Sequence, residues 1–233
     1  MTLIIVIVLG VVALVGIIVW LAVRAVRRER AREQARSAAI ANLAPQLGLT
    51  LTGGNGILRA DAQGFNSHLF TRGSKQAAFN ALEGTSSGLR VVLFDYRFEE
   101  SSGEETTTIH ESVAAFASPK GPLPAFVLKK RGIFSRLTWK KVEIEGNPEF
   151  SKRFILNGSD GATIKRLFSP SAAGFLASTK MEEKLVMEAA GPWLFLHGGR
   201  CSPENLAKFL EETSQVASGF FQNCGAMESV KAS

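Results

Sequence analysis

The sequence contains few of the residue types on which catalytic and structural sites commonly depend. It has 2 cysteines, 3 histidines and three aspartates, which are Asp61, Asp95 and Asp160. Two cysteines are too few for a small scaffold held by disulfides, so we interpret Cys201 and Cys224 as ordinary thiols in a reducing compartment, although the sequence leaves a bridge between them open. No HExxH or P-loop signature occurs. The sequence therefore predicts no cofactor and no recognised catalytic family.

One long hydrophobic run dominates the N-terminus. Residues Leu3–Val23 form 21 positions without a charged side chain. As a helix they would extend about 31 Å, close to the ~30 Å hydrocarbon core of a bilayer. No basic segment precedes the run, and arginines follow it where a cleavage site would stand in a signal peptide. We therefore predict an uncleaved transmembrane anchor over residues 1–23, in a single-pass protein whose partner is the lipid bilayer.

Positive charge is concentrated directly after this run. The chain carries a net charge of +6. Residues 24–36 contain six arginines and two glutamates, so they account for +4 of this charge. The arginines expected to lie beside a membrane are Arg24, Arg27, Arg28, Arg30, Arg32 and Arg36. Basic residues near a spanning helix remain on the cytoplasmic side, which predicts an inner-membrane protein with its N-terminus outside and a cytoplasmic C-terminal domain. The remaining chain has a net charge of only +2, so nucleic acid is an unfavoured partner.

The rest of the chain is predicted to form a basic helical stalk, one domain and a tail. The stalk covers 24–48, ending near Pro45 and Gly48, the soluble domain covers 49–223, and a flexible tail covers 224–233. The domain is predicted to be α+β, with a mainly antiparallel sheet and C-terminal helices. Expected strands lie at 49–52, 68–71, 79–83, 89–98, 106–118, 125–130, 185–189 and 193–197. A glycine-rich turn is expected at 53–56, and a polar hairpin tip at 99–105.

Helices are predicted mainly in the last third of the chain. Asp160 is expected to cap a helix over 161–168, and Ser169 with Pro170 begins a second, short helix. The closing helix is predicted to start with Ser202 as its cap and Pro203 as its first residue. Its apolar positions, which should pack on the sheet, are Leu206, Phe209, Leu210, Thr213, Ala217 and Phe220.

Two pairs of residues are the candidates for chemistry. Asp95 and His110 lie on strands predicted to be neighbours, so they would form a catalytic dyad if the register brought them together; otherwise Asp95 faces solvent or pairs with Arg97. His197 and Cys201 would be metal ligands across a Gly-Gly turn. A zinc site needs three or four ligands, however, and these two residues have only the distant Cys224 to join them. An ordinary loop histidine is the simpler interpretation of His197.

The order of these features resembles a group of uncharacterised bacterial proteins anchored by one N-terminal helix. The resemblance is carried by segments like Val91–Phe98 (VVLFDYRF), His110–Phe116, Leu123–Leu128 (LPAFVL) and Pro148–Gly158 (PEFSKRFILNG). These are packing motifs that span most of the chain after the stalk. The resemblance implies a bacterial inner-membrane setting and assigns no functional residue.

Three functions from different classes fit the sequence. The first is a membrane-tethered binding or scaffold module with an unknown protein partner. The second is a sensor of anionic lipid head groups that uses the arginines and the pairs Lys129-Lys130, Lys140-Lys141 and Lys152-Arg153. The third is an enzyme without a recognised motif, for which Asp95 with His110 would line a deep pocket. The binding module is the favoured prediction.

Overall fold

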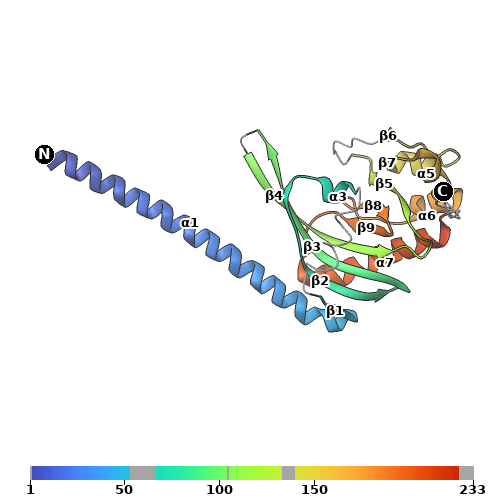
Figure 1. The fold of residues 1–233 in the computed structure, drawn as a ribbon, viewed down its shortest axis with the longest axis horizontal. Coiled ribbons are helices and arrows are strands. Elements are labelled where there is room, and N and C mark those ends of the chain that lie inside the picture. The colour runs from blue at the N-terminus through green and yellow to red at the C-terminus, as the bar shows by residue number, and fades with distance from the viewer. Residues whose placement is uncertain (1, 53–66, 104, 133–139, 226–233) are drawn as a thin grey trace, which may run out of the picture. The chain divides into compact units, whose positions relative to one another are not determined.

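The computed structural model describes residues 2–52, 67–103, 105–132 and 140–225, with the side chains of residues 2–13 excepted. Residues 1–43 and 44–233 form two compact units, which are described separately (Figure 1). The expected turn at 53–56, most of the expected tail and residue 104 of the hairpin tip lie outside the described residues. In the second unit the described strands are β1 (Leu49–Leu51), β2 (Ser74–Ser86), β3 (Leu89–Ser102), β4 (Glu105–Ala117), β5 (Leu123–Lys130), β6 (Lys140–Lys141), β7 (Phe154–Gly158), β8 (Val186–Gly191) and β9 (Trp193–His197).

The described helices divide between the two units. The first unit is the helix α1 (Thr2–Leu43). The second contains η1 (Ala44–Leu47), α3 (His68–Thr71), α4 (Pro148–Arg153), α5 (Gly161–Leu167), α6 (Pro170–Ser178), η2 (Pro203–Asn205) and α7 (Leu206–Asn223).

The strands join in one antiparallel sheet. Its nine described strands have the order β1-β2-β3-β4-β9-β8-β5-β7-β6, and every pairing between them is antiparallel. The α+β class with a mainly antiparallel sheet and a C-terminal helix is thereby confirmed. The chain places β9 and β8 between β4 and β5, so residues more than 60 positions apart become neighbours across the sheet.

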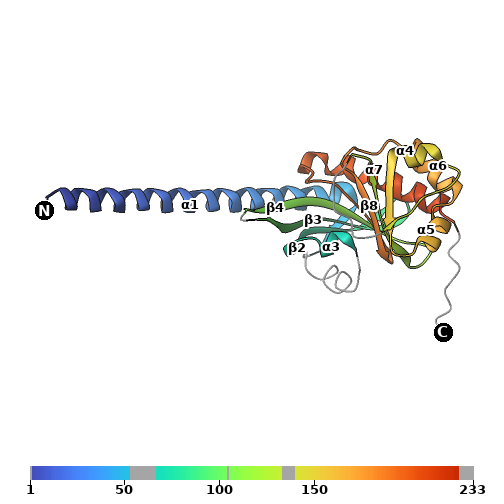
Figure 2. The same cartoon turned by 90° about the horizontal axis from the view of Figure 1, so that it is seen from above.

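Side chains alternate between the two faces of this sheet, and each face has its own cover. On one face, Phe126 of β5 packs against Phe168 at 5.0 Å between ring centroids and against Phe220 of α7 at 6.2 Å. On the other face, Tyr96 of β3 and Phe195 of β9 pack against Phe70 of α3, at 5.3 and 5.2 Å. Figure 2 shows α3 and α7 on opposite sides of the β3–β4 part of the sheet. We call these the α7 face and the α3 face.

The closing helix packs as its sequence predicts. All six of its predicted apolar-face positions are buried, with Phe220 and Ala217 fully so. Its start differs from the prediction, because Pro203–Asn205 form a separate 3₁₀ turn and the α-helix begins at Leu206. The predicted caps upstream are confirmed: the Asp160 carboxylate accepts from the Thr163 N–H at 3.1 Å, and the Ser169 hydroxyl accepts from the Ala172 N–H at 3.2 Å.

The strand predicted at 68–71 is wrong, since these residues form the one-turn helix α3. A strand would send adjacent side chains to opposite faces. Instead Leu69 is fully buried and Phe70 next to it is partly buried against the same core of the α3 face. Four residues are too few for periodicity to distinguish a strand from a turn of helix.

The predicted membrane anchor requires correction. A search of the described residues for a helix that is both long enough and apolar enough to cross a bilayer gives none. The single-pass transmembrane helix, the inner-membrane location and the N-out, C-in orientation are therefore contradicted.

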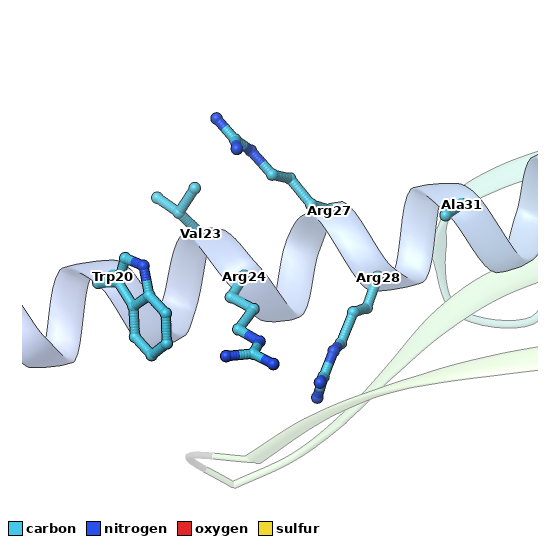
Figure 3. Close-up of a pocket in the computed structure, with 6 residues that line it drawn as sticks. All are labelled: Trp20, Val23, Arg24, Arg27, Arg28 and Ala31. Carbon is cyan, nitrogen blue, oxygen red and sulfur yellow. The ribbon is translucent and has the colours of Figure 1, made fainter.

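The arginine-rich part of α1 is a regular helix surface. Figure 3 shows Trp20, Arg24 and Arg28 on one side of the helix, and Val23 and Arg27 on the other. The Arg24 guanidinium lies 5.0 Å from the centroid of the Trp20 ring, one helical turn away. A surface hollow of about 500 Å³ runs between these side chains and Ala31, all of which belong to α1. The hollow thus reflects the spacing of long side chains on one helix.

Candidate functional site

A cavity of about 250 Å³ opens on the α3 face, at the point where β9 ends. Strand β9 ends at His197, which lies opposite Val113 of β4, whereas β4 extends further, to Glu105. The sheet therefore leaves space beside the part of β4 that β9 does not pair with. We call this cavity the His197 pocket. Its lining residues are His68, Arg72, Glu111, Val127, Lys129, Lys184, Val186, Glu188, His197, Gly198 and Gly199.

His197 lies between two carboxylates on the strands that flank it. Its Nδ1 is 2.5 Å from Glu111 Oε2 of β4, and its Nε2 is 3.2 Å from Glu188 Oε1 of β8. Both ring nitrogens donate only in the imidazolium form. Burial alone would lower the pKa of His197, but the hydrogen bonds and charges of the two glutamates outweigh it and raise the pKa to about 9. His197 is therefore charged at neutral pH.

Glu188 is fully buried and is held from several directions. Its Oε2 accepts from the Ser67 hydroxyl at 3.0 Å and from the Leu69 N–H at 2.9 Å. Its Oε1 faces both His197 and His68 Nδ1, the latter at 3.5 Å. Burial favours the neutral acid, but the hydrogen bonds from both histidines dominate and lower the pKa of Glu188. Glu188 thus fastens α3 to the sheet as an ionised carboxylate.

Arg72 follows α3 and ties it to the β3–β4 hairpin. Its Nη2 lies 3.0 Å from Glu100 Oε1, and its Nη1 lies 3.6 Å from Glu111 Oε1. The guanidinium also stands over the Phe98 ring, 4.8 Å from its centroid. Burial would raise the pKa of Glu111, but the His197 hydrogen bond and the charges of His197 and Arg72 lower it. Both acids of the pocket are therefore ionised.

Two lysines are the remaining charged residues of the lining in the described part of the chain. Lys129 of β5 is only 4% exposed, and its burial together with the charge of Arg72 lowers its pKa. Lys184 is exposed and precedes β8. Its backbone lies against Gly198, where a Cβ would come within 2.2 Å of Lys184 O. Only glycine fits this approach, which brings Lys184 to the pocket.

A buried phenol lies beside the pocket. Tyr96 is 3% exposed, and its hydroxyl has no hydrogen-bond partner among the described residues. Burial, followed by the nearby charge of Glu111, raises the pKa of Tyr96. The polar cluster therefore extends past the residues that line the cavity.

The predicted dyad residues lie on the opposite, α7 face. Asp95 is buried, and its carboxylate accepts from Asn80 Nδ2 at 2.9 Å and from the Ser112 hydroxyl at 3.2 Å. His110 stands across from Arg97 in the register, and Asp95 across from Ser112. Neither solvent exposure nor an Arg97 pair thus describes Asp95. The catalytic role of Asp95 and His110 stays a prediction.

The predicted metal pair is separated by the sheet. His197 points into the pocket, while the Cys201 N–H donates to the Ser112 hydroxyl beside Asp95, at 3.0 Å. Cys201 and Cys224 are both free thiols. Among the described residues, no group of three or more histidine, cysteine or acidic side chains has the arrangement to hold a metal ion.

Sequence reasoning did not select most residues of the pocket. Glu111 and Glu188 were missed, although Glu188 interrupts an otherwise apolar strand, and Lys129 was considered only as part of a basic pair for lipid head groups. A charge at such a position is either exposed or buried with a partner. That argument was applied to Asp95 alone, and it fits Glu188 equally well.

Comparisons with known proteins give a likeness of fold. No family model matches the chain, and no curated protein matches it. The chain is similar in fold to the crystal structure of the mycobacterial trehalose monomycolate transport factor A, TtfA, with a TM-score of 0.57 and 12% sequence identity. The likeness covers 83% of this chain and 98% of that one. At this identity it shows a shared fold.

Proposed function

We propose that this protein is a binding module and that the His197 pocket is its ligand site. The observation that carries the proposal is the convergence of buried ionised side chains on one open cavity. Burying charges is costly even when they are paired, and apolar residues of similar size commonly serve stability as well or better. A cluster of this kind that also lines a cavity has the properties of a recognition site.

A polar ligand suits this pocket better than an apolar one. Seven of its described lining residues carry charged or imidazole side chains, two are glycines, and the valines Val127 and Val186 form the apolar part. TtfA is named as a transport factor for trehalose monomycolate, a molecule with a sugar head group. That name supports including a neutral sugar among the probes, alongside charged ones.

The test uses one probe from each charge class on the full chain. Trehalose, inorganic phosphate and choline are titrated separately while the backbone amide signals of Gly198 and Gly199 are followed by NMR. At least one probe should shift these signals in a saturable way. Val186→Phe, which fills the pocket, should abolish the shift, whereas Ile155→Phe on the same sheet face should keep it.

Two results would contradict the proposal. One is that none of the three probes moves the two glycine signals. The other is that a probe binds equally well to wild type and Val186→Phe, which would place its site elsewhere. Circular dichroism of both variants establishes that they retain the fold.

A further inference from the structure

Two polar groups of the His197 pocket lie side by side without a hydrogen bond between them. Arg72 Nη1 is 3.6 Å from Glu111 Oε1, a distance that makes an ion pair but is too long for a hydrogen bond. No other described residue is hydrogen-bonded to either atom, because Glu100 accepts from Nε and Nη2 of Arg72, and His197 faces the other oxygen of Glu111. Both side chains line the cavity. The pocket therefore presents a donor next to an acceptor.

This arrangement matches a group that donates and accepts at the same atom. A hydroxyl does both, because it carries one O–H and two lone pairs. It would donate to Glu111 Oε1 and accept from Arg72 Nη1, since two atoms 3.6 Å apart leave room for one oxygen at hydrogen-bond distance from each. An ionised carboxylate or phosphate only accepts, and an ammonium only donates. Each of these ions therefore matches half of the pair.

A second position for a hydroxyl lies on α3. His68 lines the same cavity, and its Nδ1 faces Glu188 at 3.5 Å. Its other ring nitrogen, Nε2, is hydrogen-bonded to no described residue. A hydroxyl pairs with this nitrogen in either state, because it donates to a bare nitrogen and accepts from a protonated one. The lining therefore suits a ligand with more than one hydroxyl.

The size of the cavity suits a single small ring. Its volume of about 250 Å³ is below the ~300–1,000 Å³ of pockets that hold drug-sized ligands. Val127 and Val186 offer apolar surface to the C–H groups of such a ring. The cavity therefore combines groups for hydroxyls with a small apolar wall.

An uncharged ligand leaves the ion pairs of the pocket intact. Glu188 is paired with both His68 and His197, and Glu111 is paired with His197 and Arg72. A ligand with a full charge would place that charge beside a like charge of one of these pairs. Hydroxyls form hydrogen bonds with the paired groups and bring no such repulsion.

We infer that the His197 pocket binds a neutral polyol the size of one sugar ring, with one hydroxyl bridging Glu111 and Arg72. This inference rests on the proposed function and names the ligand class of the same site. The ring could belong to a free sugar or to the head group of a glycolipid, since both present the same hydroxyls to the pocket.

The test follows the backbone amide signals of Gly198 and Gly199 in the full chain by NMR during titration with methyl β-D-glucoside. We expect a saturable shift at millimolar concentration. Tetrahydropyran, which has the same ring without hydroxyls, should give no shift. Acetamide also donates and accepts, but through separate atoms, and should bind more weakly than the glucoside.

Arg72→Lys tests the bridging hydroxyl in the protein. The guanidinium holds Glu100 through two nitrogens and keeps Nη1 for the ligand, whereas one ammonium cannot hold both in this geometry. The affinity for the glucoside should fall about tenfold or more, as for the loss of a hydrogen bond to a charged group. The tetrahydropyran comparison uses the wild-type chain, so it tests the inference even if Arg72→Lys does not fold.

Arg90→Lys is the matched control. Arg90 also pairs with a glutamate, Glu83, and also stands over an aromatic ring, that of Trp193, but it is not among the described residues that line the pocket. This variant should bind the glucoside as wild type does.

A second titration distinguishes the two sources of the ring. Methyl and octyl β-D-glucoside carry the same sugar without and with a long alkyl chain, and the octyl compound is used below its micelle-forming concentration. Equal affinities indicate a free sugar, and tighter binding of the octyl compound indicates a glycolipid. Both results support the inference if Arg72→Lys weakens the binding.

The inference is overturned if methyl β-D-glucoside gives no saturable shift, if tetrahydropyran or acetamide binds as well as the glucoside, or if Arg72→Lys binds it no more weakly than Arg90→Lys. A shift by phosphate or choline that Val186→Phe abolishes, together with no shift by the glucoside, would refute the polyol and leave the binding module standing. Failure of the glucoside and of trehalose, phosphate and choline would refute both.

Discussion

The pH dependence of stability is the sharpest physical consequence of the buried His197 cluster. His197 has its pKa raised from the ordinary 6.5 to about 9 by Glu111 and Glu188. A raised pKa means that the folded state binds the proton more tightly than the unfolded state. The associated stability is fully present below pH 6.5 and is lost as the pH rises through about 9.

The size of this stabilisation follows from the change in the pKa of His197. Each tenfold change in proton affinity corresponds to about 1.4 kcal/mol. Raising the pKa from 6.5 to about 9 therefore stabilises the folded protein by about 3 kcal/mol below pH 6.5. The two glutamates have lowered pKa values, so their contribution is present above the ordinary value of 4.5 and is lost as the pH falls below it. Stability should be highest between these limits.

Urea denaturation at intervals from pH 6 to pH 10 measures this directly. The free energy of unfolding of wild type should fall by about 3 kcal/mol relative to that of His197→Gln, which cannot titrate. His110→Gln is the control, because it replaces a histidine on the α7 face and leaves the His197 contacts intact. If wild type and His197→Gln lose stability in parallel between pH 6.5 and pH 9, His197 does not carry the buried charge and the reasoning is refuted.

Substitutions at three further positions test separate parts of the structure by urea denaturation. Glu188→Gln should lower the free energy of unfolding by about 3–5 kcal/mol, because the charged His197 would keep only one of its two carboxylate partners. A loss under about 1 kcal/mol would contradict a buried ion pair between His197 and Glu188. Phe168→Ala should cost about 3–5 kcal/mol by opening a cavity against Phe126 and Phe220, and an unchanged midpoint would show that this core is misplaced. Ser169→Ala should cost about 1 kcal/mol as the loss of the α6 cap, whereas Ser169→Asn should retain most of the stability, and equal losses in both would argue against capping.

The elements that could be predicted are those whose partners are close in sequence. Strands β3 and β4 are joined by a short polar turn, and their pairing runs without interruption from Val91 opposite Phe116 to Ser102 opposite Glu105. The face of α7 follows from helical periodicity, and the helix packs against β2, β3, β4 and the helix α6. In both cases the local pattern already contains the information that decides the structure.

The site could not be predicted because its parts meet through distant pairings. Glu188 and Lys129 come together only because β8 pairs with β5, with Val127 opposite Glu188. Glu111 joins them because β9 is inserted between β4 and β8. The face that each side chain takes depends on these registers, and one residue of slippage would reverse it. Ser67, His68 and Arg72 depend further on a turn of helix that resembled a strand.

Asp95 shows why a buried acid alone does not identify a site. Asn80 has a left-handed backbone, with φ of 55°, at the irregularity where β2 shifts its register against β3. Its amide reaches Asp95, and Ser112 links the same carboxylate to the backbone of Cys201. These contacts connect the irregular strand with the loop after β9, so packing accounts for the burial of Asp95, and the predicted catalytic role stays a prediction.

The contacts of the His197 cluster differ from those of Asp95. Its described carboxylates are paired and its histidine is charged, beside an open cavity. A cluster needed only to fasten α3 would be complete with Glu188, Ser67 and the Leu69 N–H. The open cavity that His197 and Glu111 line is not needed for this fastening, and the proposed ligand site rests on that cavity rather than on the buried acid.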